Sequence, residues 1–151
     1  MKKDIPDPYM KRIVNEVNSI SSGIFDNIKN LDQYSQSVSQ LVLKILMQCA
    51  CLGQNYGPIE IGRKKIGEII NRDWLIHNFM KVADESINYS DEWEYRRLVE
   101  LVVLHIPELK EEVLAKGINS ENEEVREVVD DYRDKYHLNE DLLTKVNLLT
   151  K

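Results

Sequence analysis

The side chains most able to carry chemistry in this sequence are its histidines and its carboxylates. The three histidines, His77, His105 and His137, lie far apart in the chain. The sequence has neither the H-E-x-x-H pattern of zinc proteases nor the paired E-x-x-H pattern of di-iron helix bundles. It also lacks a phosphate-binding glycine loop, a G-x-S-x-G turn, and a cysteine with an obvious histidine partner. We therefore expect no catalytic centre, no metal site and no cofactor.

Carboxylates are abundant, and they leave one enzymatic hypothesis open. Glu92, Glu100 and Asp130 are dispersed over segments that the apolar pattern predicts to be helices. Carboxylates that a fold brings together can act as a general acid and a general base. A small α-helical hydrolase that uses these groups is therefore an alternative to a protein without catalytic activity.

Two cysteines, Cys49 and Cys51, stand two residues apart inside an apolar segment. On a helix, positions i and i+2 point to different faces, so the two thiols are poorly placed to form a disulfide. A C-x-C pair can bind a soft metal, but no second pair and no nearby histidine completes a site. Free cysteines commonly pack as small apolar side chains. We interpret both as buried free thiols in a reducing compartment, the cytoplasm.

The most unusual string is Asp-Glu-Trp-Glu-Tyr-Arg-Arg at residues 91–97. Acidic residues in a first helical turn complement the helix dipole, which explains half of the string structurally. Trp93 and Arg97 are spaced i, i+4 and can form an exposed cation–π pair, with Glu100 one turn further along. Because tryptophan and arginine are enriched in binding hot spots, this string is either ordinary helix packing or a recognition surface.

A basic cluster precedes this string. Together with a following tryptophan and histidine it faintly resembles a helix-turn-helix, although the turn lacks the right spacing. Isolated basic faces are usually solvated or paired with acids, so a nucleic-acid binder through residues 63–72 remains only an alternative. The cluster consists of Arg63, Lys64, Lys65 and Arg72, followed by Trp74 and His77.

The composition is that of an ordinary globular protein. Hydrophobic residues make up 42% of the 151 positions and charged residues 30%, a balance that disordered chains lack. Only six glycines and four prolines are present, so few tight turns can connect short strands. No apolar run approaches the roughly 20 residues that span a bilayer, and no apolar stretch follows the basic N-terminus as in a secretory signal. We expect a soluble protein with no membrane partner.

The net charge of −6 is unevenly distributed. Residues 1–73 carry ten basic and eight acidic side chains, whereas residues 74–151 carry ten basic and eighteen acidic ones. Phosphate backbones repel an acidic surface, which disfavours nucleic-acid binding by the C-terminal half. A basic protein partner complements this charge, and simple solubility explains it equally.

Apolar periodicity predicts about nine helices with short connections and no strand. The third expected helix has the most continuous apolar set and should be central, with Gly53 at its C′ position. Ser90 is expected to cap the sixth helix. Ser120 and Glu123 form an S-x-x-E capping box for the eighth. The expected helices cover residues 8–20, 24–31, 38–52, 58–70, 73–87, 90–105, 107–116, 120–136 and 139–149.

Residues 73–106 and 103–136 are similar to each other at an offset of 30 residues. Ser90 aligns with Ser120, and acidic-Tyr-Arg at 94–96 aligns with acidic-Val-Arg at 124–126. Each copy reads as helix, tight turn, helix. Such a unit cannot bury its own apolar stripe and must stack on a neighbour.

The second copy, residues 107–136, resembles a HEAT-type repeat. In that family the valine of acidic-Val-Arg packs in the core and the arginine helps to fix the stacking between repeats. The resemblance implies these roles for Val125 and Arg126, and by alignment for Tyr95 and Arg96. Val129 belongs to the same apolar stripe and is expected in the core. HEAT-type proteins are mostly scaffolds, and a fold alone names no function.

These patterns predict an all-α single domain over residues 1–151, built as stacked antiparallel helix pairs in a HEAT-like α-α superhelix. N-terminal helices would occupy 1–57, HEAT-like pairs 58–136 and a last helix 139–149. The expected function is a non-catalytic protein-interaction module, and an immunity protein that neutralises a basic toxin is one form that this function takes. The expected partner-binding residues are Glu92, Trp93, Arg97, Glu100, Glu127 and Asp130.

Overall fold

The structure, a computed structural model, describes residues 8–53 and 55–133. These residues form helices and connecting turns, and no strand is present among them. The all-α prediction is thus confirmed, with about nine helical segments. The last expected helix at 139–149 and His137 lie outside the described residues. The segments are α1 (Pro8–Ile20), η1 (Ile24–Gln33), α2 (Gln36–Leu52), α3 (Tyr56–Gly67), α4 (Arg72–Ser86), α5 (Glu92–His105), η2 (Pro107–Leu109), α6 (Lys110–Ala115) and a further helix at 123–133.

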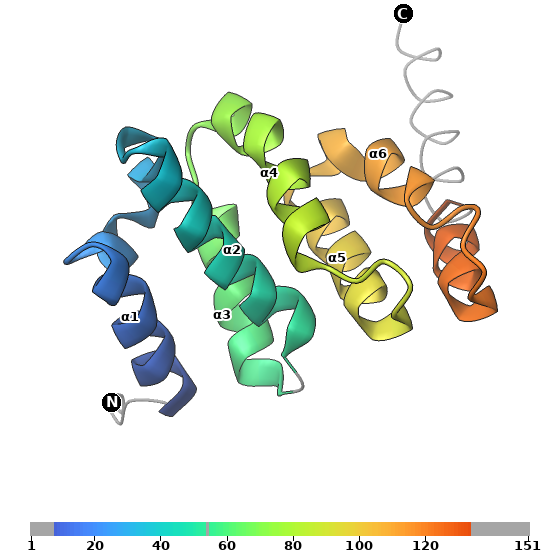
Figure 1. The fold of residues 1–151 in the computed structure, drawn as a ribbon, viewed down its shortest axis with the longest axis horizontal. Coiled ribbons are helices and arrows are strands. Elements are labelled where there is room, and N and C mark those ends of the chain that lie inside the picture. The colour runs from blue at the N-terminus through green and yellow to red at the C-terminus, as the bar shows by residue number, and fades with distance from the viewer. Residues whose placement is uncertain (1–7, 54, 134–151) are drawn as a thin grey trace, which may run out of the picture.

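Consecutive helices fold back on one another along the longest axis of the molecule (Figure 1). Helix α2 packs most extensively on α3, which lies behind it in Figure 1, and it also contacts α4 and α5. Helix α5 lies behind α4 and contacts α6. Connections of a few residues join these helices, as is usual for antiparallel neighbours. The result is a row in which α3, α5 and helix 123–133 form one layer.

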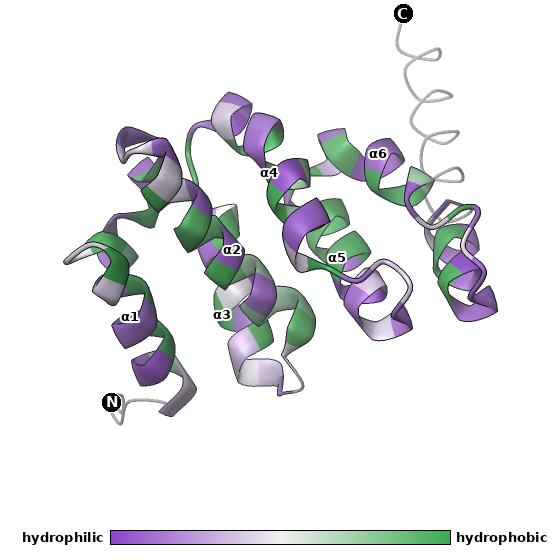
Figure 2. Cartoon of the chain, viewed as in Figure 1, coloured by the Kyte–Doolittle hydropathy of each residue, from purple (hydrophilic) through white to green (hydrophobic). Residues whose placement is uncertain are grey.

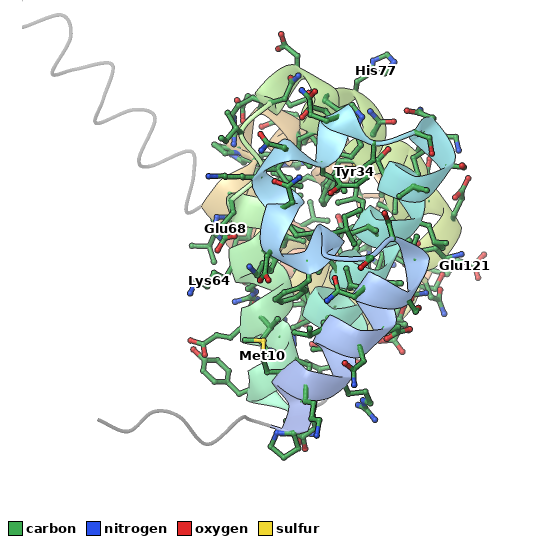
Figure 3. The ribbon with its side chains drawn as sticks, turned by 90° about the vertical axis from the view of Figure 1, so that its left-hand side faces the viewer. Met10, Tyr34, Lys64, Glu68, His77 and Glu121 are labelled. Atoms are coloured by element: carbon green, nitrogen blue, oxygen red, sulfur yellow. The ribbon has the colours of Figure 1, made fainter. Side chains whose placement is uncertain are left out.

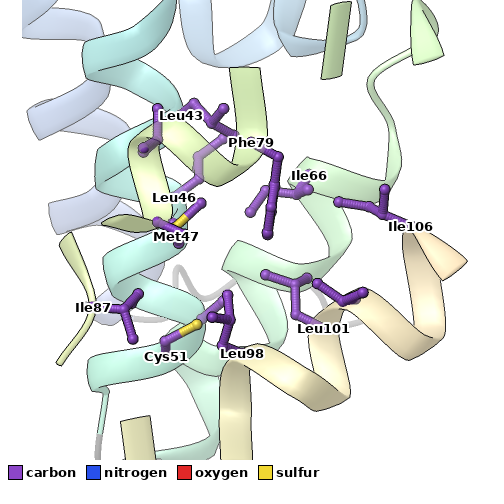
Figure 4. Close-up of a cluster of buried hydrophobic side chains, with 14 of the residues drawn as sticks. Leu43, Leu46, Met47, Cys51, Ile66, Phe79, Ile87, Leu98, Leu101 and Ile106 are labelled. Atoms are coloured by element: carbon purple, nitrogen blue, oxygen red, sulfur yellow. The ribbon is translucent and has the colours of Figure 1, made fainter. Parts of the chain in front are cut away.

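The core lies between these helices, where their apolar residues meet (Figure 2). Helix α2 contributes to it along most of its length, as expected for the most apolar segment. Burying one such side chain contributes roughly 1.5–3 kcal/mol before the entropy of ordering is counted. The close-up in Figure 4 shows the central cluster, which includes Leu43, Leu46, Met47, Cys51, Ile66, Phe79, Ile87, Leu98, Leu101 and Ile106, all of them buried.

Glycine in α3 allows close contact with α2. A Cβ added to Gly62 would lie 2.5 Å from the Leu46 carbonyl oxygen and 2.8 Å from the Ala50 nitrogen. A glycine inside a helix costs roughly 1 kcal/mol relative to alanine, but here it lets the two backbones approach. Helix α3 therefore forms in spite of its glycines.

Two residues at helix ends differ from the sequence prediction, one after α2 and one before α5. Gly53 does follow α2, but its φ of −67° is not left-handed. The cap of α5 is Asp91 rather than Ser90, and its side chain accepts from the Glu94 N–H at 3.0 Å. Aspartate and serine are both good caps, so local preference does not decide between the adjacent residues 90 and 91.

The predicted capping box at Ser120 and Glu123 is also wrong. The last described helix begins at residue 123, and the Asn122 side chain accepts from the Glu124 N–H at 2.9 Å. The Ser120 hydroxyl instead accepts from the Asn122 N–H at 3.1 Å. Serine orders the turn and asparagine caps the helix.

The expected second helix is a 3₁₀ helix, η1, interrupted by non-helical backbone at Asn27 and Asn30. Its entry is fixed by Gly23, whose φ of 76° is left-handed, and by the Asn18 side chain, which accepts from the Phe25 N–H at 2.9 Å. None of the described helices is long and apolar enough to cross a bilayer.

Candidate functional site

Helix α5 presents one face to the core and the opposite face to solvent. Its core face includes Tyr95, Leu98 and Val102, all buried. Its opposite face carries four residues spaced by four, three and four positions, which place them within one narrow stripe of a helix. We call this the α5 stripe; it consists of Trp93, Arg97, Glu100 and Leu104.

The two ends of the α5 stripe are apolar and exposed. Trp93 is 62% exposed and Leu104 is 61% exposed. The Arg97 guanidinium carbon lies 5.8 Å from the centre of the Trp93 ring, so the cation–π pair predicted from the i, i+4 spacing is present. This contact holds the indole in place on the surface, at the modest strength of an exposed pair, about 0.5–1 kcal/mol.

Glu100 occupies the middle of the stripe and joins three helices. It forms an ion pair with Arg63 of α3 and lies 3.9 Å from the Arg97 Nη1. From the other side, the Tyr132 hydroxyl donates to the Glu100 Oε2 at 3.4 Å. Burial, followed by the negative charge of Glu100, raises the pKa of the Tyr132 phenol. The carboxylate thus positions α3 and helix 123–133 on either side of α5.

Arg96 makes a second link between α5 and helix 123–133. Its Nη2 lies 3.5 Å from the Asp131 Oδ2 and 3.7 Å from the Glu92 Oε2. Of the acids expected to meet a partner, Glu92 and Glu100 are therefore each matched by an arginine of this chain.

The last described helix separates apolar from acidic residues. Val125 and Val129 are buried, in the positions that the apolar pattern predicts. Glu127 and Asp130 are exposed, and within the described residues neither forms an ion pair. Arg126 is also exposed and donates to the Ser120 carbonyl oxygen at 2.5 Å. It therefore stiffens its own turn, whereas Arg96 reaches across to a neighbouring helix.

A hollow of about 420 Å³ lies beside Trp93, where the end of α2 meets the start of α5. Leu52 and Gly53 line it from α2, and Trp93 and Arg97 line it from α5. Cys51 also borders it, but burial raises the pKa of this thiol to about 12. Asp91 and Glu94 line it as well. The hollow therefore offers a mixture of charged and apolar surface beside an exposed indole, and no reactive thiol.

The basic cluster of residues 63–72 is largely paired with acids. Arg63 is bound to Glu100, Lys65 lies 3.3 Å from the Glu68 Oε1, and Arg72 lies 2.5 Å from the Glu108 Oε1. Lys65 also lies 4.4 Å from the centre of the Phe25 ring. Lys64 is exposed on the same side of the molecule as Met10 and Glu68 (Figure 3).

The two described histidines lie on different helices, His77 on α4 and His105 at the end of α5. His77 is exposed at one end of the molecule (Figure 3), whereas His105 ends α5 and packs on Gly67 of α3. Burial, followed by the positive charges of Arg63 and Arg72, lowers the pKa of His105. No group of histidine, cysteine and carboxylate side chains within 8–53 and 55–133 is arranged to hold a metal ion.

Sequence reasoning missed three residues of this face: Arg63, Leu104 and Tyr132. The spacing from Trp93 to Leu104 could have identified Leu104, because it continues the same helical stripe. The other two are far from Glu100 in sequence, and only the packing of three helices brings them to it.

Comparisons with protein-family models, with curated proteins and with solved structures found no match to this chain.

Proposed function

We propose that this protein is a non-catalytic interaction module, built from HEAT-like helix pairs, that binds another protein through the solvent face of α5 and helix 123–133. The observation that carries the proposal is Trp93, which is 62% exposed and held by Arg97 beside a hollow. An exposed aromatic ring that is already ordered loses little entropy on binding and suits a hot spot.

Charge favours a basic partner for the same face. Glu92 and Glu100 are neutralised by arginines, so they shape the surface more than they charge it. Glu127 and Asp130 are exposed without such a match among the described residues. Opposite charges across an interface mainly speed association, and salt screens that gain. An inhibitor or immunity protein for a basic toxin is one form of this function, and a reducing cytoplasm suits its two free thiols.

The alternatives have less support in the geometry. Glu92, Glu100 and Asp130 lie on two helices, and none of them lines the hollow beside Trp93. A nucleic-acid surface over residues 63–72 would need free positive charge, yet Arg63, Lys65 and Arg72 each face a carboxylate. Nucleic-acid binding there would require these ion pairs to be broken first.

The test uses the wild-type protein as bait in an extract of its native host, at low salt. We expect a basic protein to be captured. With that protein purified, Glu127→Lys/Asp130→Lys should slow association at low salt, and Trp93→Ala should speed dissociation. The control is Asp84→Lys/Glu85→Lys, which makes the same charge change on α4 and also removes the ion pairs of these residues with Lys116 and Lys81. If both charge-reversed proteins bind at the parent's rate, the proposed acidic surface is wrong.

A further inference from the structure

The α5 stripe has a property that the acidic face does not share: when it is laid antiparallel on a copy of itself, apolar positions meet apolar positions and each charge meets the opposite charge. From one end it runs apolar, positive, negative, apolar, with Trp93, Arg97, Glu100 and Leu104 in that order. The spacing of four, three and four is that of a coiled-coil seam, in which two helices pack side by side at a shallow angle.

Rotation about a two-fold axis between residues 98 and 99, perpendicular to α5, makes this order self-complementary. The axis places Trp93 of one copy opposite Leu104 of the other, and Arg97 of one copy opposite Glu100 of the other. Each contact occurs twice, as in any isologous interface. Apolar groups meet apolar groups, and opposite charges meet at the centre.

The exposure of the four side chains suits this pairing. The two apolar ends are more than half exposed, at 62% and 61%, so they retain surface to bury. Arg97 and Glu100 are 29% and 27% exposed and are already oriented by their neighbours. At the side of helix 123–133, Asp131 is matched by Arg96.

We propose that the α5 stripe binds a second copy of this chain, with the two α5 helices antiparallel. This rests on the proposed function in taking α5 as a binding face, and it names one partner for it. The same two-fold axis places the acidic helices 123–133 of both copies on one side. Because these helices repel each other and one helix face is a small contact area, we expect the dimer to have low affinity.

The decisive experiment is a charge-swap complementation measured by sedimentation velocity, at protein concentrations up to about 0.5 mM, since a small interface gives weak affinity. The parent should dimerise with concentration. Arg97→Glu and Glu100→Arg should each weaken dimerisation about tenfold or more, because like charges then face each other across the axis. An equimolar mixture of the two variants should recover the dimer, because opposite charges face each other again in the mixed pair.

Control variants on α4 and α2 distinguish a specific effect on dimerisation from a general effect of changed charge. Lys81→Glu and Glu85→Arg make the same charge changes in an exposed ion pair of α4, and they should leave dimerisation unchanged. Because Glu100→Arg also removes the partner of Arg63, Leu104→Asp gives an independent test at an exposed position, with Leu41→Asp of α2 as its control. Leu104→Asp should abolish the dimer, and Leu41→Asp should not.

A parent protein that stays monomeric over the whole range would overturn the proposal, and so would a mixture that fails to recover the dimer while both variants remain folded. Neither result decides whether the protein binds a basic partner, because the capture experiment tests that function separately. If the parent is monomeric and Trp93→Ala still weakens binding of the basic partner, only the self-pairing is contradicted. A dimer with no other partner would retain the self-pairing and contradict the basic-partner function.

Discussion

The Tyr95 hydroxyl of α5 donates to the Val113 carbonyl oxygen of α6 at 2.8 Å, from a side chain that is fully buried. Burial also raises the pKa of this phenol above its ordinary value, so it remains a neutral donor. The bond ties the helix that carries Trp93 and Glu100 to the next helix in the row.

We expect Tyr95→Phe to lower the free energy of unfolding by about 1 kcal/mol, since it removes one buried hydrogen bond and keeps the ring. Tyr95→Ala should cost more, roughly 3–5 kcal/mol, because it also leaves a cavity. Urea denaturation followed by circular dichroism measures both. Tyr56→Phe is the control, since Tyr56 is 69% exposed. Equal stability of Tyr95→Phe and the parent would show that the bond contributes nothing.

Val129→Asp should unfold the domain or destabilise it severely. The Val129 side chain is 1% exposed, and an unpaired carboxylate in such a place costs several kcal/mol or is forced to take up a proton. Asp130→Val, the reverse exchange at the next and exposed position, should change stability little. If Val129→Asp melts at the parent's temperature, the assigned buried face of helix 123–133 is wrong.

The sequence predicts the helices and their buried faces because both depend on local spacing. Apolar periodicity identified α2 as the central helix, and the i, i+4 spacing identified the Trp93–Arg97 pair. The predicted capping residues of the two helices that carry the acidic face are wrong by one and two positions, since Asp91 competes with the adjacent Ser90 and Asn122 with Ser120 two residues before it. Local patterns do not distinguish neighbouring residues that can all cap.

The junction around Glu100 could not be predicted in this way. Arg63 and Tyr132 are 37 and 32 residues away from it in the chain, and no spacing rule relates them. In the sequence, Arg63 belongs to a basic cluster and Glu100 to an expected acidic surface, whereas in the fold each neutralises the other. Charge patterns along a chain overstate the charge of a folded surface when pairs form between helices.

Stability should fall as the pH drops below about 6.5, in part because of His105. Its pKa lies below the ordinary value of 6.5 in the folded protein, so between these two values the unfolded chain takes up a proton that the folded protein does not. Stability contributed by neutral His105 is therefore present above pH 6.5 and lost as the pH falls through the lowered pKa.

Urea denaturation of the parent, His105→Gln and His77→Gln at pH 7.5 and pH 5.5 measures this contribution, with both pH values chosen around the ordinary histidine pKa of roughly 6.5. His105→Gln should show a smaller loss of stability between the two pH values than the parent. The exposed His77 provides the control, and its variant should behave as the parent does. An unchanged pH dependence in His105→Gln would assign the acid sensitivity to other groups.

Both thiols should react slowly in the folded protein. Burial raises the pKa of Cys51 to about 12 and that of Cys49 to about 11, where nearby Glu16 adds to the effect of burial. The thiolate is the reactive form, so at pH 8 only a small fraction of either group is able to attack a reagent. Cys49 is half-buried and borders a hollow of about 580 Å³ between α1 and α2, so it should react before Cys51.

The rate of labelling by a chromogenic disulfide, measured for Cys49→Ser and Cys51→Ser in buffer and in urea, separates the two thiols. Urea should raise both rates many-fold. Rapid labelling of Cys51 in the native protein would instead show that the packing of α2 against α5 opens readily, and that the hollow beside Trp93 extends to a reactive thiol.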